Sequence, residues 1–375
     1  MRYLLHLGRL ADLSWYELTQ NLSTGVQLSK VTETIAQVEF TDSAALTAKL
    51  EALSGIIKAS SVVATLATPD QAIELISDDL IKNDRTDFSV YSSPQSDTSE
   101  HMKAVKRQLR TQQRSARFVL PKGDGLSASV LLHQKVSEYG IIQLQSELLL
   151  IKTVWVQNID HWSFKDAGKP QRDPKKGMLP PKLAHMMVNF ISPDIQHKPG
   201  KRLYDPFCGT GTILIEALEL GWNTVGSDLT QSAVQASAEN LHWFTTQQHL
   251  PQQYALFSAD ATHVTPQQLG TKIDAIVTEP FLGKQQPSEA QLPNVFKGLE
   301  KLYWGALKRW KAILNDQAEL VIVTPLVQLG KHEYSLASLI DKSRELGYSI
   351  ISGPMIYTRE QTIVKRAIYH IKYHS

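Results

Sequence analysis

The chain has 375 residues, a formal net charge of +2, 42% hydrophobic residues and a single cysteine. At roughly 100–200 residues per domain this length predicts two or three domains, and the hydrophobic content excludes a disordered chain. The lone cysteine excludes an internal disulfide and favours a reducing, cytoplasmic location. No apolar run approaches the roughly 18–20 residues of a membrane helix, so we expect no membrane partner.

Charge is distributed unevenly along the chain. Residues 1–100 carry 7 basic and 14 acidic side chains, residues 101–182 carry 15 and 6, and residues 183–375 carry 17 of each. The middle segment is therefore a basic block between an acidic segment and a neutral one. Such an asymmetry indicates an anionic partner at one surface, which the near-neutral total conceals.

Alternating strands and helices are predicted over the first part of the chain, which is typical of a small α+β region. We expect strands at 3–7, 36–40 and 56–65 and helices at 12–22, 43–53 and 70–81. Residues 84–99 are rich in Ser, Asp and Thr and are predicted to be a connecting loop. Further strands are expected at 118–120, at 127–132 and within 140–151.

The segment His101–Arg117 carries six basic side chains and no acidic one, and it is predicted to be a helix. Spacings of three and four place these side chains along one helical stripe. Such a charge run is either a solvated helix face or a surface that contacts phosphates. Under the second interpretation the RNA-binding residues are Lys103, Lys106, Arg107, Arg110, Arg114 and Arg117, with Arg172, Lys175 and Lys176 of the basic linker at 161–178.

The second half of the chain begins with a helix at 179–191, opened by two prolines, and then a glycine-rich turn. A predicted strand at 201–205 runs into Pro-Phe-Cys-Gly-Thr-Gly-Thr and a helix at 213–220, the order of the first nucleotide-binding unit of a doubly wound sheet. Gly209 and Gly211 let the backbone approach a ligand, and the helix N-terminus offers free N–H groups. The dinucleotide fingerprint and the P-loop Lys-Ser/Thr pair are both absent. The turn resembles the first motif of Rossmann-like S-adenosylmethionine methyltransferases.

Two further carboxylates follow predicted strands of the same sheet. Asp228 ends the strand at 223–228, where an acid can accept the ribose hydroxyls of an adenosyl group. Asp260 follows the strand at 255–259, where a carboxylate can accept from the adenine amino group. Each acid alone is equally consistent with helix capping or strand termination. Together with Asp205, they favour a cofactor site at the ends of successive strands.

A fourth strand is predicted at 273–278 and is followed by Glu279-Pro280-Phe281-Leu282. Methyltransferases that modify exocyclic base amines carry Asp/Asn-Pro-Pro-aromatic here. The lone pair of such an amine is delocalised into the ring, so a carboxylate or carbonyl must accept an N–H to aim it at the methyl group. In this chain Glu279 replaces the acid, and Phe281 occupies the second proline position. This difference from the Asp/Asn-Pro-Pro-aromatic motif either transfers base stacking to Phe281 or alters activity. The alternative is that the segment is an ordinary strand-to-loop turn.

The rest of the chain completes the sheet. We expect helices at 295–314 and 334–346 and strands at 319–324, 348–357 and 362–373, the last two forming a terminal hairpin. Four side chains around the hairpin are either turn residues or line a path for RNA, and the sequence does not separate these readings: Tyr357, Arg359, Gln361 and Arg366.

Three segments, 114–122, 172–184 and 205–217, with weaker support from 357–366, resemble the tRNA guanine-N2 methyltransferases that join an N-terminal THUMP-type region to a Rossmann-like domain. The resemblance implies an α/β class I methyltransferase sheet of seven strands with the last antiparallel. It implies a ferredoxin-like region at 1–84, a THUMP-type RNA-binding region at 85–160 and a methyltransferase domain at 179–375. It also implies S-adenosyl-L-methionine as the cofactor and methylation near position ten of tRNA.

Carried onto this sequence, the resemblance implies the following sites. The catalytic residues would be Glu279, Pro280, Phe281 and Leu282. The cofactor-binding residues would be Pro180, Asp205, Pro206, Phe207, Cys208, Gly209, Thr210, Gly211, Thr212, Asp228, Leu229, Asp260, Ala261 and Glu279.

Several alternatives remain. The target could be rRNA guanine, adenine in DNA or a protein side chain, or the chain could be a non-catalytic RNA-binding homologue. We expect no metal site, because no His/Cys cluster has ligand spacing. Cys208 is interpreted as a small packing residue rather than a nucleophile. The partner is expected to be tRNA, and the chain is expected to act as a monomer or with a small partner subunit.

Overall fold

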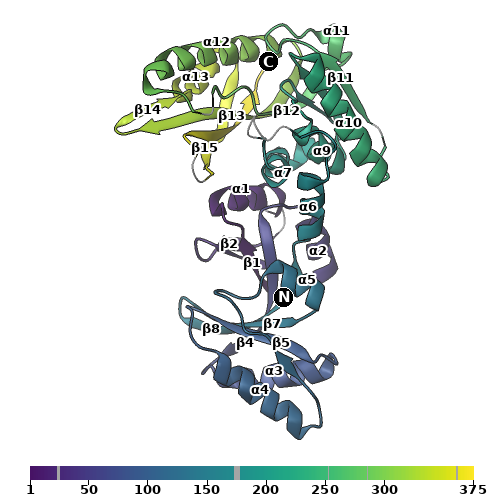
Figure 1. Ribbon diagram of the computed structural model, residues 1–375, viewed down its shortest axis with the longest axis vertical. Helices are drawn as coiled ribbons and strands as arrows, with labels where there is room; N and C mark the ends of the chain where they lie inside the picture. The colour runs from purple at the N-terminus through teal and green to yellow at the C-terminus, as the bar shows by residue number, and fades with distance from the viewer. Residues whose placement is uncertain (23–25, 173–177, 252, 285, 360–361) are drawn as a thin grey trace. The chain divides into compact units, whose positions relative to one another are not determined.

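In the computed structural model the chain divides into two compact units, Met1–His161 and Trp162–Ser375 (Figure 1). The structure describes residues 1–22, 26–172, 178–251, 253–284, 286–359 and 362–375. Each unit has a sheet of its own with helices packed against it, so the two are described separately. Among the described residues, no helix combines the length and apolar character that a membrane span requires.

The N-terminal unit is built on one mixed sheet, with the strand order β2-β3-β1-β4-β8-β7-β5-β6. The strands are β1 (Arg2–Leu7), β2 (Leu28–Lys30), β3 (Ile35–Glu39), β4 (Ile56–Leu66), β5 (Asp87–Ser93), β6 (Arg117–Phe118), β7 (Ser137–Leu144) and β8 (Glu147–Val156). The long strand β4 pairs antiparallel with β1 on one side and with β8 on the other. The sheet therefore continues across the boundary that the sequence predicts at residue 84.

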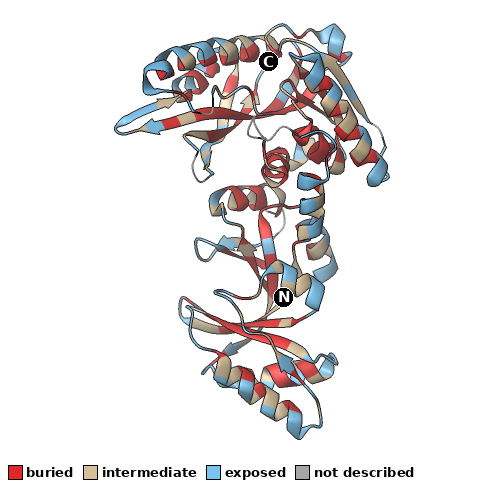
Figure 2. Cartoon of the chain, viewed as in Figure 1, coloured by how far each residue is buried: buried red, intermediate tan, exposed pale blue. Residues whose placement is uncertain are grey.

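Helices cover this sheet in pairs. The helices are α1 (Ala11–Leu22), α2 (Ser43–Glu51), α3 (Gln71–Lys82), α4 (Ser99–Thr111) and α5 (Ala128–Gln134), and the division between the two units falls within α6 (Ile159–Ala167). Helices α1 and α2 contribute Leu18 and Leu50 to one core, and α3 and α4 contribute Ile76 and Val105 to another. Figure 2 shows α3 and α4 with exposed outer faces, as expected of amphipathic surface helices.

The sheet of the C-terminal unit has the order β11-β10-β9-β12-β13-β16-β15, with β14 paired to β13 beside this path. The strands are β9 (Arg202–Asp205), β10 (Asn223–Asp228), β11 (Tyr254–Ser258), β12 (Ile273–Thr278), β13 (Leu314–Leu329), β14 (His332–Ser335), β15 (Tyr348–Tyr357) and β16 (Val364–Tyr373). Strands β9 to β13 pair in parallel, and β16 lies antiparallel to both β13 and β15. The predicted antiparallel last strand is thus confirmed, and β14 is an additional strand.

Burial explains why the central strands form. All six residues of β12, Ile-Asp-Ala-Ile-Val-Thr, are buried, as expected of a parallel strand covered on both faces. The helices are α7 (Pro181–Asn189), α8 (Pro193–Gln196), α9 (Thr212–Glu219), α10 (Gln231–Gln247), α11 (Pro266–Leu269), α12 (Leu292–Trp310) and α13 (Ala337–Lys342), with 3-10 turns η2 (Glu289–Gln291) and η3 (Ser343–Leu346). Helix α12 packs its buried stripe, including Tyr303 and Trp310, into the main core.

Three predicted elements are wrong. The loop expected at 84–99 contains β5, whose Phe88 and Val90 are buried although serines surround them. The strand expected at 127–132 is the helix α5, because the Ser127 side chain accepts a hydrogen bond from the N–H of Val130 and caps it. The helix expected at 334–346 is divided into the end of β14, α13 and η3.

Candidate functional site

The glycine turn lies between β9 and α9, at the carboxyl end of the parallel strands. Gly209 and Gly211 have φ values of 51° and 81°, in the left-handed region that favours glycine. A Cβ on Gly211 would lie 2.5 Å from the Ser237 hydroxyl, whereas one on Gly209 would lie 4.0 Å from the Phe207 carbonyl oxygen. Gly211 therefore permits close packing, and Gly209 leaves the backbone open to a ligand.

Asp205 connects this turn to β12. Its Oδ1 accepts a hydrogen bond from the Thr278 hydroxyl at 2.7 Å and another from the N–H of Phe207 at 3.1 Å. Asp205 is buried, and burial raises its pKa to about 7 even though both hydrogen bonds favour the ionised form. Nearby Asp228 and Glu279 add to the rise. The hydrogen bond between Thr278 and Asp205 thus joins the start of the glycine turn to the strand end that precedes Glu279.

The other two strand-end carboxylates differ in their contacts. Asp228 accepts from the Gly209 N–H at 3.1 Å through Oδ2 and from the Thr230 N–H at 3.1 Å through Oδ1, so it faces the glycine turn. Asp260 accepts from the N–H and hydroxyl of Thr262 at 2.8 and 2.7 Å. Burial raises the pKa of Asp260, but these bonds and His263 outweigh burial and leave it lowered. Both carboxylates thus lie at strand ends and act as hydrogen-bond acceptors.

Glu279 directly follows β12 and carries the acceptor predicted for the amine. Its Oε1 receives a hydrogen bond from Arg366 Nε at 2.6 Å, and the described residues donate no hydrogen bond to Oε2. Burial raises the pKa of Glu279, while the charges of Arg366 and Arg359 oppose the rise. The next residue, Pro280, is buried, whereas the Phe281 side chain is 61% exposed. Leu282, at the aromatic position of the motif, is half-buried.

The β15–β16 hairpin supplies the side chains around this glutamate. Arg366 lies with its guanidinium carbon 5.6 Å from the centre of the Tyr357 ring. Arg359 donates to the Tyr357 hydroxyl at 3.1 Å and to the carbonyl of Met178 at 3.1 Å. Of the hairpin residues that the sequence left undecided, Arg366 therefore contacts Glu279, Tyr357 contacts both arginines, and Gln361 is outside the described residues.

The remaining predicted cofactor residues lie around the turn or at neighbouring strand ends. Leu229, directly after Asp228, is 72% exposed, and the Ala261 carbonyl accepts from the Trp310 indole at 3.1 Å. Cys208 is buried, and burial raises the pKa of its thiol, which keeps it protonated at neutral pH. The others are half-buried or buried: Pro180 at the N-cap of α7, and Pro206, Phe207, Thr210 and Thr212 of the turn.

Sequence reasoning missed four residues that build the site. Thr278 bonds Asp205, and Lys169 donates to the Thr212 hydroxyl at 3.0 Å. Asn240 of α10 donates to the carbonyls of Thr210 and Gln171 at 2.8 and 2.9 Å. Gly226 of β10 provides the close helix packing of a third glycine, since a Cβ there would lie 2.4 Å from Leu214 of α9. Only Gly226 had a signal in the sequence, a glycine inside a buried strand.

The structure differs in two ways from the basic helical stripe predicted over residues 103–117. Helix α4 ends at Thr111, so Arg114 and Arg117 lie beyond it, and both are paired, with Asp84 at 2.7 Å and Asp87 at 2.6 Å. Lys103 pairs with Glu100 at 2.8 Å, and Lys106 lies 5.7 Å from the Phe118 ring. Two exposed arginines form no ion pair with any described residue: Arg107 and Arg110.

The predicted linker residues are mostly not placed. Arg172 is exposed, and Lys175 and Lys176 lie outside the described residues. Since α4 belongs to the N-terminal unit and the carboxylates to the C-terminal unit, the RNA-binding role of all these side chains stays a prediction.

One buried cluster resembles a metal site by its residue types. Ligand atoms of His185, Glu216 and Glu219 lie within 4.8 Å of one another. Lys165 Nζ lies 2.5 Å from Glu216 and 2.6 Å from Glu219, in the place where a cation would bind. The cluster is therefore an ion-pair network between α6, α7 and α9.

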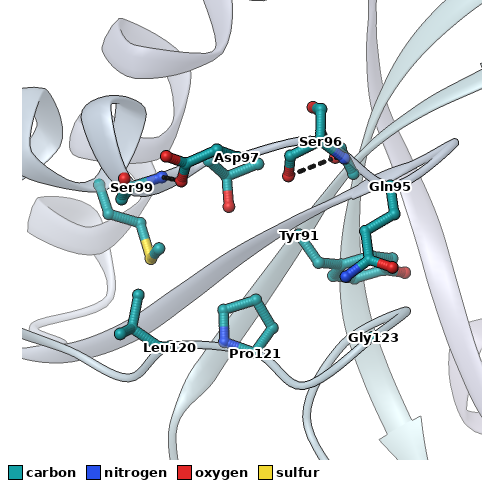
Figure 3. A pocket seen from close by; sticks show the side chains of 11 residues that line it. Tyr91, Gln95, Ser96, Asp97, Ser99, Leu120, Pro121 and Gly123 are labelled. Atoms are coloured by element: carbon teal, nitrogen blue, oxygen red, sulfur yellow. Dashed lines mark hydrogen bonds between the residues drawn. The ribbon is translucent and has the colours of Figure 1, made fainter.

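The N-terminal unit contains a hollow of about 410 Å³, lined by residues that belong to none of these motifs (Figure 3). Its lining mixes polar and apolar groups and carries no basic side chain, and Asp97 adds a negative charge to one wall. This lining does not suit a phosphate group. The residues around it are Tyr91, Ser92, Gln95, Ser96, Asp97, Thr98, Ser99, Met102, Leu120, Pro121 and Gly123.

A sheet of this order, with a glycine turn after its first strand and acids at the next strand ends, defines the class I methyltransferases. Comparisons with known proteins agree. A family model described as "RMKL-like, methyltransferase domain" matches residues 170–329, and a DNA methylase model matches residues 78–239.

Two curated relatives refine the class, and one solved structure agrees with the fold. A "tRNA (guanine(10)-N2)-dimethyltransferase" of Methanothermobacter thermautotrophicus is 29% identical over 236 residues, which cover 62% of this chain and 61% of that protein. A "Probable tRNA (guanine(10)-N2)-dimethyltransferase" of Methanothermococcus thermolithotrophicus is 30% identical over 118 residues, covering 32% of this chain and 70% of that protein. The crystal structure of TrmN from Thermus thermophilus superposes with a TM-score of 0.58 at 17% identity, covering all of both chains. The chain belongs to the tRNA guanine-N2 methyltransferase family.

Proposed function

We propose that this protein transfers a methyl group from S-adenosylmethionine to the exocyclic N2 of a guanine in tRNA, near position ten. The observation that carries the proposal is the place of Glu279: a carboxylate at the end of β12, joined through Thr278 and Asp205 to the glycine turn. Since the chain spans 61% of the Methanothermobacter relative's length, the substrate and reaction are inferences for this chain.

The residues present fit the cofactor. The open backbone at Gly209, the acceptor Asp228 and the exposed Leu229 lie at the carboxyl ends of β9 and β10, where ligands bind in open α/β sheets. Asp228 and Asp260 would accept from the ribose hydroxyls and the adenine amino group. When bound, S-adenosylmethionine supplies an electrophilic methyl group on a sulfonium.

Glu279 and Pro280 would orient the amine. Glu279 Oε2 accepts one N–H, which directs the nitrogen lone pair at the methyl carbon. The donor would supply the methyl group to this nitrogen and would leave as the neutral thioether. The proton released by the methylated amine passes to Glu279 or to solvent. The exposed Phe281 is available to stack on the base, which must leave its helical stack to reach the site.

The test is methyl transfer to bulk tRNA with labelled S-adenosylmethionine, followed by nucleoside analysis. We expect N2-methylguanine or its dimethyl form as the product. The Glu279→Gln variant should transfer the methyl group at least 100-fold more slowly and retain its affinity for the cofactor. Absence of any guanine-N2 product from every tRNA tested would refute the specific activity. A methylated rRNA instead would reassign the target.

A second candidate is a non-catalytic RNA-binding protein, favoured by one observation: Phe281-Leu282 replaces the proline and aromatic residue of the motif. Binding of tRNA without cofactor binding in calorimetry would select it. A cytoplasmic location and a monomer, alone or with a small partner subunit, accompany the leading proposal as expectations.

A further inference from the structure

Lys169 is a buried cation beside the glycine turn. It is 4% exposed, and its Nζ donates to the Thr212 hydroxyl at 3.0 Å. No carboxylate of a described residue lies within ion-pair distance of it. An ammonium group in such surroundings is costly unless an anion balances it. Burial lowers the pKa of Lys169 accordingly, against the opposing charges of Glu216 and Asp166 and with a further lowering by Arg172.

The contact with Thr212 places this ammonium at the start of α9. Thr212 is the first residue of the helix, and the first N–H groups of a helix have no acceptor within it. The helix dipole adds partial positive charge at this end. A buried lysine and a helix N-terminus therefore converge on one point.

The position of Lys169 is held by its neighbours in the chain. Asn240 accepts from the Gln171 N–H at 2.8 Å and donates to the carbonyls of Gln171 and Thr210. This arrangement binds the segment containing Lys169 to the glycine turn from the side of α10. The cation is thus built into the same frame as the predicted cofactor residues.

We propose that Lys169 and the N-terminus of α9 bind the carboxylate at the amino-acid end of S-adenosylmethionine, an inference that rests on the proposed function. The methyl donor is an anion only at that carboxylate. The predicted adenosyl contacts, Asp228 and Asp260, are themselves anionic and cannot take this part. Lys169 therefore adds an anion site to a pocket whose other predicted charged side chains are carboxylates.

The experiment compares two ligands by calorimetry on the full chain: S-adenosylhomocysteine and its decarboxylated analogue, which keeps the adenosine, the sulfur and the amine. The wild-type protein should bind the analogue about 10- to 100-fold more weakly, as expected for loss of a charge-assisted hydrogen bond. Lys169→Met should bind S-adenosylhomocysteine weakly and should no longer distinguish the two ligands.

A matched control comes from the other end of the same helix. Lys201 donates to the carbonyl of Leu220, the C-cap of α9, at 3.2 Å. Lys201→Met removes an equally charged, partly buried lysine and should keep the full wild-type preference. Lys169→Arg should retain part of it, because the cation is kept.

The outcomes distinguish a failure of the role proposed for Lys169 from a failure of the proposed function. Equal affinity of the wild type for both ligands overturns the role of Lys169, whatever the variant does. Equal weakening of both ligands in Lys169→Met shows that Lys169 only ties the chain to α9. If the wild type binds neither ligand, the proposed function itself fails.

Discussion

Arg366 Nε donates to Glu279 Oε1 at 2.6 Å, and this bond joins β16 to the residue that follows β12. It occupies one carboxylate oxygen and leaves the other for the proposed amine. Arg366 therefore acts as a positioning residue for Glu279. Its charge also favours the ionised carboxylate and opposes the rise in the pKa of Glu279 that burial causes.

Replacing Arg366 by Met should move the acidic limb of the kcat–pH profile to higher pH. Burial favours the protonated form of Glu279, and the lost charge no longer opposes it, so a higher pH is needed to ionise the group. We expect kcat to fall about 10- to 100-fold at neutral pH and to recover partly at alkaline pH. Asp205 and Tyr303 also face Glu279, so the full profile is measured from pH 5 to 10.

Arg359→Met is the matched control for that substitution. Arg359 is exposed, and it influences Glu279 through charge rather than by direct contact, so the shift in the profile should be smaller. An Arg366→Met profile that is reduced at every pH without moving would indicate a purely structural role for Arg366.

The free energy of unfolding of Asp205→Asn, taken relative to that of the wild type, should be larger at pH 8 than at pH 4. The pKa of Asp205 is raised in the folded state to about 7 from an ordinary 3.8. Its stabilising contribution is therefore complete below about pH 4 and is lost as the pH rises through 7. The difference between the two proteins should change by about 3–4 kcal/mol over this range, measured by urea unfolding without ligand. A constant difference would show that Asp205 is ionised throughout.

Arg107→Gln with Arg110→Gln should weaken tRNA binding more than Arg114→Gln with Arg117→Gln. The first two arginines form no ion pair with a described residue, whereas the second two are already paired with aspartates. Each lost phosphate contact should reduce the slope of log affinity against log salt by about 1. Filter binding from 50 to 300 mM salt measures both effects. Equal slopes in the wild type and the first double variant would remove α4 from the RNA interface.

Lys165→Met should destabilise the protein by about 3–5 kcal/mol, because Glu216 and Glu219 are left without their buried cation. The double variant with Glu216→Gln should recover part of the loss. Lys182→Met is the control, since its Nζ lies 5.6 Å from the Trp162 ring while that of Lys165 lies 3.8 Å away. Thermal unfolding compares all three, and a loss below 1 kcal/mol for Lys165→Met would contradict the network.

Much of the C-terminal fold could be predicted because its central strands are continuous apolar runs with abrupt ends. The bounds of β10 and β12 agree with the sequence to the residue. Strand β5 could not be predicted in this way, since its three serines resemble a loop and tertiary burial, including that of Phe88 and Val90, makes it a strand.

The site was predictable to the extent that its residues are local in sequence. The glycine turn and the strand-end acids carry their own signatures. The partner of Glu279 does not, because Arg366 is 87 positions away and its register depends on how β16 pairs with β13. Lys169 was also missed, since a lysine within a basic linker has no pattern that distinguishes burial from exposure.

The hydroxyl of Thr278 limits the substitutions that the protein can accept at this position. It bonds Asp205, beside the glycine turn, and it directly precedes Glu279 in the chain. A substitution at this one position would disturb the methyl-donor pocket and the base pocket at the same time. We therefore expect substitutions at Thr278 to change the affinity for the proposed methyl donor and the choice of the target base together.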